Sequence, residues 1–240
     1  MVKFDCVTKI YFGNPALSNI SFDFKPGQIY AVTGAAKSGK STLINAAAGR
    51  LKPDSGSITF KKGCKNLTGY LSSSPLKFSG TVKDRLTAAL LPNGSVYARG
   101  SDRLYTTIDA FELHDILNAR SHSLRHHERQ RVELASLLLN DYMLLALDEP
   151  IPPEGGDNPK RAAIAIKEYC NRTGCTVILA ASSIIHAMRI ADCLIVMDGG
   201  SIAEYGRPAD VVLTPKTQAA AEHIAAPLHS NSNNSHGRQL

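Results

Sequence analysis

The sequence predicts an α/β protein, a sheet that carries a helical subdomain. Two observations support this prediction. Strand-like segments alternate with helical segments at both ends of the 240-residue chain, and between them residues 82–139 repeat their apolar positions at helical spacing. Hydrophobic residues make up 43% and charged residues 20% of the chain, which excludes wholesale disorder.

The amino-terminal part is predicted to contain mostly strands. Val2–Cys6 and Ile20–Phe24 alternate apolar with polar residues, the pattern of half-buried strands. After the Pro26-Gly27 turn comes a short apolar strand, Ile29–Val32. A helix over Thr42–Ala48 and a strand over Ile58–Phe60 follow.

The carboxyl-terminal part again alternates. We expect strands over 142–147, 176–181, 194–197 and 201–205, and helices over 158–169 and 184–190. These elements predict a single domain over residues 1–226, with about 82–139 as its helical subdomain. Residues 227–240 are polar and rich in Asn and Ser, so we expect a disordered tail.

Charge and cysteine content narrow the class of protein. The formal charge is +6, yet the basic residues are scattered apart from 120–131, which favours a solvated surface over a nucleic-acid site. Five cysteines with no C-x-x-C pair indicate free thiols and no metal cluster. With no export signal and no apolar run long enough to cross a bilayer, we expect a cytoplasmic protein.

The strongest chemical signal is a phosphate-binding loop. The run Gly34-Ala35-Ala36-Lys37-Ser38-Gly39-Lys40-Ser41-Thr42 matches G-x-x-x-x-G-K-[ST], between a predicted strand and a predicted helix. Glycines let backbone N–H groups turn inward around a triphosphate, and the helix start adds its positive dipole end. Lys40 would place its charge at the β and γ phosphates, and the hydroxyl of Ser41 would ligate Mg²⁺.

Two carboxylates follow the apolar strand near residue 147. Asp148 is predicted to hold Mg²⁺ through its water shell, and Glu149 to polarise the attacking water as the general base. Adjacent strand residues point to opposite faces, so the two carboxylates divide the work.

Together these motifs resemble the nucleotide-binding subunit of an ABC transporter, over roughly residues 2–213. Further matching stretches are Val7–Tyr11, in which Tyr11 would stack on adenine, Ser79–Val82, and Ala191–Gly206. The resemblance implies a P-loop NTPase fold, with a mostly parallel sheet, an amino-terminal antiparallel β portion and a helical insert. It implies ATP and Mg²⁺ as ligands, and a transmembrane permease and a second ATP-binding subunit as partners. It also places the chain on the cytoplasmic face of the membrane.

Three family motifs are altered. The signature L-S-G-G-Q is replaced by Leu124-Arg125-His126-His127-Glu128, where two side chains stand in place of glycines and Glu128 adds repulsion for a phosphate. Ser73 stands where the glutamine of the glutamine loop is expected, and Ser182 replaces the switch histidine. The loop after Pro150 also lacks the family's S-A-L-D.

These changes predict different consequences for binding and for hydrolysis. The phosphate loop is intact, so Mg-ATP binding should persist, whereas losing charge-stabilising groups typically costs about 10²–10³-fold each in rate. Hydrolysis is therefore expected to be weak or partner-dependent, and a heterodimer with an intact partner signature is preferred over a homodimer. The alternative is a catalytically inactive regulatory subunit that uses ATP as a dimerisation ligand. A DNA- or ribosome-associated member of the superfamily, a nucleotide kinase and direct DNA binding fit the chain less well.

Overall fold

The protein is built on two sheets. The computed structural model describes residues 1–75, 77–90, 97–151 and 159–230. The larger sheet has six strands in the order β5 (Thr68–Leu71), β6 (Leu144–Asp148), β7 (Thr176–Ala180), β3 (Ile29–Gly34), β8 (Cys193–Asp198) and β9 (Ser201–Gly206). Neighbouring strands are parallel except for β9, which runs antiparallel to β8. The mostly parallel α/β fold expected from the sequence is confirmed.

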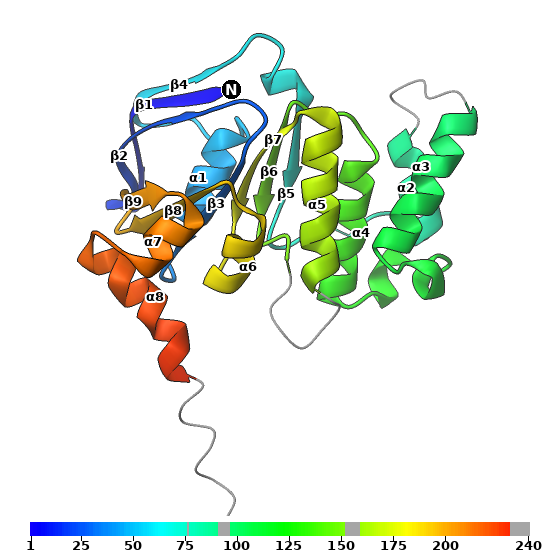
Figure 1. The fold of residues 1–240 in the computed structure, drawn as a ribbon. Coiled ribbons are helices and arrows are strands. Elements are labelled where there is room, and N and C mark those ends of the chain that lie inside the picture. Colours follow the sequence, from blue (N-terminus) through cyan, green and yellow to red (C-terminus); the bar gives the residue numbers. More distant parts are fainter. Residues whose placement is uncertain (76, 91–96, 152–158, 231–240) are drawn as a thin grey trace, which may run out of the picture.

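The smaller sheet is the expected antiparallel β portion. It contains β1 (Val2–Tyr11), β2 (Asn14–Phe24) and β4 (Ser55–Phe60), with β1 at the centre. Register shifts along β1 fall near Cys6, which has a positive φ of 48°. Figure 1 shows this sheet and helix α1 (Lys40–Ala47) on one side of the larger sheet.

Most of the other helices cover the opposite face or extend beside it. They are α2 (Val82–Leu90), α3 (Tyr97–Ala110), α4 (His126–Leu138), α5 (Pro159–Thr173), α6 (Ile184–Ile190), α7 (Pro208–Leu213) and α8 (Gln218–Ser230). Short 3₁₀ turns lie at Lys65–Leu67, His114–Ile116 and Ser121–Ser123. In Figure 1 α2 and α3 lie at the far edge, beyond α4, within the stretch for which the sequence predicts a helical subdomain.

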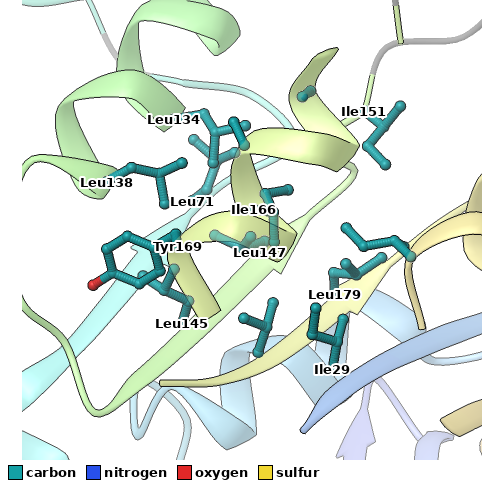
Figure 2. Close-up of a cluster of buried hydrophobic side chains, with 14 of the residues drawn as sticks. Ile29, Leu71, Leu134, Leu138, Leu145, Leu147, Ile151, Ile166, Tyr169 and Leu179 are labelled. Atoms are coloured by element: carbon teal, nitrogen blue, oxygen red, sulfur yellow. The ribbon is translucent and has the colours of Figure 1, made fainter. Parts of the chain in front are cut away.

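Strands buried on both faces explain the continuous apolar runs in the sequence. All residues of β3, β6 and β7 are buried. Alternate residues enter two cores, so that Ile29 and Ala31 face the helices while Tyr30 and Val32 face α1 and the smaller sheet. Figure 2 shows the first core between α4, α5 and the sheet, with Ile166 against Leu147 and Leu179.

The structure differs from the expectation at the end of the described chain and in two short elements. Helix α8 continues to Ser230, so residues 227–230 are helical, and residues 231–240 lie outside the described part of the chain. Sequence patterning also missed the short strand β5 and helix α7. Within the described residues, no helix is both long and apolar enough to cross a bilayer.

Candidate functional site

The site forms at the carboxyl end of β3, where the chain turns through the phosphate loop into α1. Glycine is required at both ends of this loop. A Cβ on Gly34 would come within 2.2 Å of the carbonyl oxygen of Met197, and one on Gly39 within 2.4 Å of that of Ala16. Both glycines also have positive φ values, 148° and 102°. The G-x-x-x-x-G spacing is thus dictated by backbone packing as well as by chemistry.

The start of α1 offers free donors to an anion. Gly39 is its N-cap residue and provides no side-chain cap, and no acidic residue lies in the first turn. The Ser38 hydroxyl is buried and has no hydrogen-bond partner among the described residues. A buried hydroxyl without a partner is unfavourable, so an incoming acceptor would stabilise it.

Lys40 folds back over the loop. Its Nζ donates to the carbonyl oxygens of Gly34 at 2.8 Å and Ala35 at 2.9 Å. Burial lowers the pKa of Lys40, whereas the nearby carboxylates of Glu149 and Asp148 act to raise it. The ammonium is therefore near both acids.

The loop surrounds an open cavity. Its accessible volume is about 260 Å³, and it is lined by Ala16 from β2 and by residues 37–42. Within the loop the backbone N–H of Ser38 donates to the carbonyl of Ala35 at 3.2 Å. Lys37 has a φ of 64°, which completes the turn. These contacts shape residues 34–42 into a turn around the open cavity.

Ser41 and Asp148 meet although 107 residues separate them. The Ser41 hydroxyl donates to Oδ1 of Asp148 at 3.1 Å. Asp148 ends the buried strand β6 and is itself buried. Hydroxyl and carboxylate oxygens are ligands that Mg²⁺ accepts, so these two residues fit the predicted role. Among the described residues, no group of three or more His, Cys, Asp or Glu side chains forms a metal site made by protein alone.

Glu149 is held by α4, by the end of β7 and by the loop that follows β7. Its backbone N–H donates to the carbonyl of Ala180 at 3.2 Å, and the side chain of Gln130 donates to its carbonyl oxygen. Both the N–H and the hydroxyl of Ser182 donate to Glu149 Oε2, at 3.0 and 2.9 Å. Glu149 has a φ of 53°, an unusual value for a residue other than glycine. The candidate base is therefore fixed by the residue that stands in the switch-histidine position.

The β1–β2 hairpin carries two aromatic rings at its tip, and its second strand reaches the phosphate loop. Ala16, on the second strand of the hairpin, lines the phosphate-loop cavity. At the tip, Tyr11 is partly exposed and lies 5.5 Å from the ammonium of Lys9, while the Phe12 side chain is fully exposed. Tyr11 is therefore available to a base, and Phe12 is a second candidate that sequence reasoning missed.

The altered signature forms the amino-terminal end of α4, which the Glu128 side chain caps. Arg125 is the N-cap residue, and Glu128 folds back onto it. One carboxylate oxygen of Glu128 accepts from the backbone N–H of Arg125 at 2.7 Å and the other from its guanidinium at 2.9 Å. These hydrogen bonds lower the pKa of Glu128. An acidic side chain therefore occupies the helix end to which an anion would bind.

The segment with Ser73 borders a large surface hollow. Ser73 follows β5, whose last residue Leu71 pairs with Leu147 beside Asp148. The hollow has an accessible volume of about 840 Å³. Its lining comes from β5 and the following loop, the end of α1, α2 and α4, and includes Arg50, Ser72, Lys77 and Arg85. The departure from S-A-L-D, at residues 151–157, lies almost entirely outside the described residues.

Sequence reasoning also missed a histidine beside the loop. His223 on α8 places its Nε2 2.6 Å from Oγ1 of Thr33, the residue before Gly34. Thr33 is completely buried. No motif in the sequence connects residues 190 positions apart.

A phosphate loop joined to a strand-end serine–aspartate pair, on this sheet, defines a P-loop nucleotide-binding domain. The family model described as ABC transporter matches residues 17–152, more than half of the chain, so the protein belongs to the ABC transporter family. Solved structures agree with the fold. "Structure of ATP binding subunit of ABC transporter" superposes with a TM-score of 0.78 at 19% identity, covering 94% of this chain and 98% of that one. The ATP-binding cassette MJ0796 "bound to ADP and Pi" gives 0.73 at 20% identity, covering 87% and 99%.

Curated relatives are ATP-binding subunits of different transporters. The putrescine transport ATP-binding protein PotG of Escherichia coli K12 is 26% identical over 92% of this chain, and the hemin import ATP-binding protein HmuV of Shewanella denitrificans 29% identical over 88%. The sulfate/thiosulfate import protein CysA of Mesostigma viride is 28% identical over 90%. The chain spans 60% of the length of PotG, 64% of CysA and 89% of HmuV.

Proposed function

We propose that this protein is the ATP-binding subunit of an ABC transporter, which binds Mg-ATP at residues 34–42 and couples it to transport through a separate membrane subunit. The observation that carries the proposal is the open phosphate-loop cavity lined by Lys40 and Ser41, with Asp148 hydrogen-bonded to Ser41 beside it. Lys40 is positioned to exchange its two carbonyl partners for phosphate oxygens. Ser41 and Asp148 would hold Mg²⁺, which supplies positive charge to the phosphates.

Glu149 is the candidate general base. The histidine that the family has beside this base is replaced here by Ser182. A serine hydroxyl can orient the carboxylate but brings no positive charge toward the γ phosphate. Each missing charge-stabilising group typically costs about 10²–10³-fold in rate, and such losses are not additive. We therefore propose weak or partner-dependent hydrolysis, with nucleotide binding retained.

The amino-terminal end of α4, which Glu128 caps, supports a heterodimer. In the family, the signature of one subunit grips the γ phosphate bound by the other. Here the Glu128 carboxylate already accepts hydrogen bonds at that helix end and would repel a phosphate. Two copies of this chain would bring two such ends together. A second ATP-binding subunit with an intact signature would complete the site at Lys40 in this one.

The membrane partner is proposed to contact the hollow beside Ser73. In the family, the glutamine loop reports to the membrane domain, and here the corresponding loop forms one wall of the 840 Å³ hollow. Arg85 in the lining is paired with Glu133, whereas Arg50 and Lys77 have no acidic partner among the described residues and supply positive charge to the hollow. This contact would hold the subunit peripherally on the cytoplasmic face of the membrane.

Equilibrium binding followed by turnover tests the proposal. The purified chain should bind Mg-ATP with a dissociation constant below about 1 mM, and a complete lack of affinity for nucleoside triphosphates would refute it. Co-purified membrane and ATP-binding partners should raise turnover, and Glu149→Gln should abolish that turnover.

A second function is favoured by Ser182 and Glu128, namely a regulatory subunit for which ATP is only a dimerisation ligand. It predicts the same binding but background turnover with every partner. Glu149→Gln separates the two functions, because it would leave the regulatory subunit unchanged.

A further inference from the structure

Helix α8 brings an imidazole to the base of the phosphate loop. Thr217 begins this helix by accepting from the N–H of Ala220 at 3.2 Å, and the Glu204 carboxylate on β9 accepts from the N–H of Thr217 at 3.1 Å. Ala220 is fully buried and Ile224 packs on the same core. His223, three residues after Ala220, lies on this packed face, which explains why its ring can reach Thr33.

The contact with Thr33 is direct and well placed. The 2.6 Å separation of Nε2 and Oγ1 is a short hydrogen bond to a hydroxyl inside the protein. Thr33 is followed by Gly34, whose carbonyl accepts from Lys40. His223 is therefore connected to Lys40, the lysine that would bind the phosphates, through its hydrogen bond to Thr33 and the hydrogen bond from Lys40 to the adjacent Gly34.

The electrostatic surroundings of the ring are simple. Burial lowers the pKa of His223, and the nearby ammonium of Lys40 lowers it further. Among the described residues, Lys40 is the charged group whose electrostatic repulsion lowers the pKa of this imidazole. On the elements packed against α8, Glu204 of β9 is engaged by the backbone at residues 216 and 217, Asp210 of α7 by Arg207, and β8 carries Cys193 and Asp198 at its two ends. Glu222, on α8 itself, accepts from Gln218.

We propose that His223 is a further nucleotide-binding residue, which takes up a proton when a triphosphate binds at Lys40 and then adds a second positive charge to the site. The inference rests on the proposed ATP binding. Without nucleotide, partial burial and the nearby ammonium both favour the neutral form of this half-buried ring. A bound triphosphate reverses the sign of that local charge, so binding favours the imidazolium.

Linkage fixes the direction of the pH effect. If binding raises the pKa of His223, the complex binds more protons than the free protein, so nucleotide affinity increases as pH falls. The affinity changes with pH only in the interval between the pKa of His223 in the free protein and its pKa in the complex. A shift of one unit corresponds to about a tenfold gain in affinity below both values.

Two substitutions separate charge from structure. His223→Gln keeps a side chain that can hydrogen-bond to Thr33 but cannot be charged, and His223→Ala removes both. His114→Gln is the matched control, because His114 is paired with Asp109 in the helical subdomain. Binding of the non-hydrolysable analogue Mg-AMP-PNP is measured by titration calorimetry at about pH 6 and pH 8. Buffers of different ionisation enthalpy give the number of protons taken up.

The wild-type chain and His114→Gln should take up a fraction of a proton near pH 6.5 that His223→Gln does not. They should also bind the analogue about threefold to tenfold more tightly than His223→Gln at pH 6, but equally at pH 8. In nuclear magnetic resonance titrations, the His223 ring should acquire a higher pKa on binding. The inference is overturned if His223→Gln matches wild type in proton uptake and affinity while His223→Ala is weaker, since that result shows a structural contact. If the wild-type chain binds no nucleotide, the proposed function itself fails.

Discussion

One carboxylate oxygen of Glu149 accepts hydrogen bonds from both the backbone N–H and the hydroxyl of Ser182. The serine at the switch position therefore orients the candidate base without contributing charge. Its backbone contact does not depend on the side chain for any residue other than proline, whereas its hydroxyl contact requires the serine side chain.

Removing that hydroxyl tests its role in positioning. Ser182→Ala should reduce turnover of the assembled transporter about tenfold, because a hydrogen bond to a charged group contributes about 1.5–3 kcal/mol and the N–H contact remains. Affinity for Mg-ATP should be unchanged. Steady-state rates of Ser182→Ala are compared with Ser123→Ala, whose hydroxyl bonds only locally to Arg120. Equal rates for the two variants would exclude a positioning role.

The Ser41–Asp148 pair predicts how Mg²⁺ affects binding. Asp148→Asn keeps a side chain of the same shape but removes the negative charge, so Mg²⁺ should strengthen ATP binding by about tenfold less than in wild type. In chelator the two proteins should bind ATP with similar affinity. Titrations with and without Mg²⁺ give both values. An unchanged Mg²⁺ dependence would place the metal elsewhere.

The hairpin tip predicts the adenine contact. Replacing both Tyr11 and Phe12 by alanine should weaken ATP binding by about tenfold, since stacking of a base on an aromatic ring is worth about 1–3 kcal/mol. Inorganic triphosphate has no base, so its binding should not change. The single substitutions then show which ring makes the contact. Equal ATP affinity of the double variant and wild type would remove the hairpin from the site.

Glu128 predicts an acid-sensitive start of α4. Its pKa is lowered by the hydrogen bond from Arg125, so its stabilising effect is present above the pKa of the unfolded chain and is lost as pH falls through the folded-state value. Glu128→Gln should lower thermal stability near neutral pH, by about 1 kcal/mol for a lost cap, and the difference should shrink below about pH 4. Melting temperatures at several pH values check this. Glu112→Gln, also paired with an arginine but outside α4, is the control.

Sequence reasoning succeeded where a local pattern reflects a local physical need. The glycines at 34 and 39 are required by their φ values and by carbonyl groups against them, and the apolar run before Asp148 is buried on both faces. It missed β5 because the strand has only four residues and one is Gly69.

Contacts between elements that are distant in the sequence could not be predicted from local residue spacing. Neither the hydrogen bond from Gln130 to Glu149 nor the contact of His223 with Thr33 leaves a trace in local spacing. The sequence showed Glu128 as a repulsive charge, yet not that it caps α4, because arginine is an unusual N-cap residue.

The central claim is that the phosphate loop and its lysine bind the triphosphate of ATP. Equilibrium titration of Lys40→Ala with Mg-ATP tests it most directly, with Lys61→Ala as a control for the loss of one lysine charge. The account predicts at least about a tenfold loss of affinity for Lys40→Ala and none for Lys61→Ala. Wild-type affinity in Lys40→Ala would contradict it.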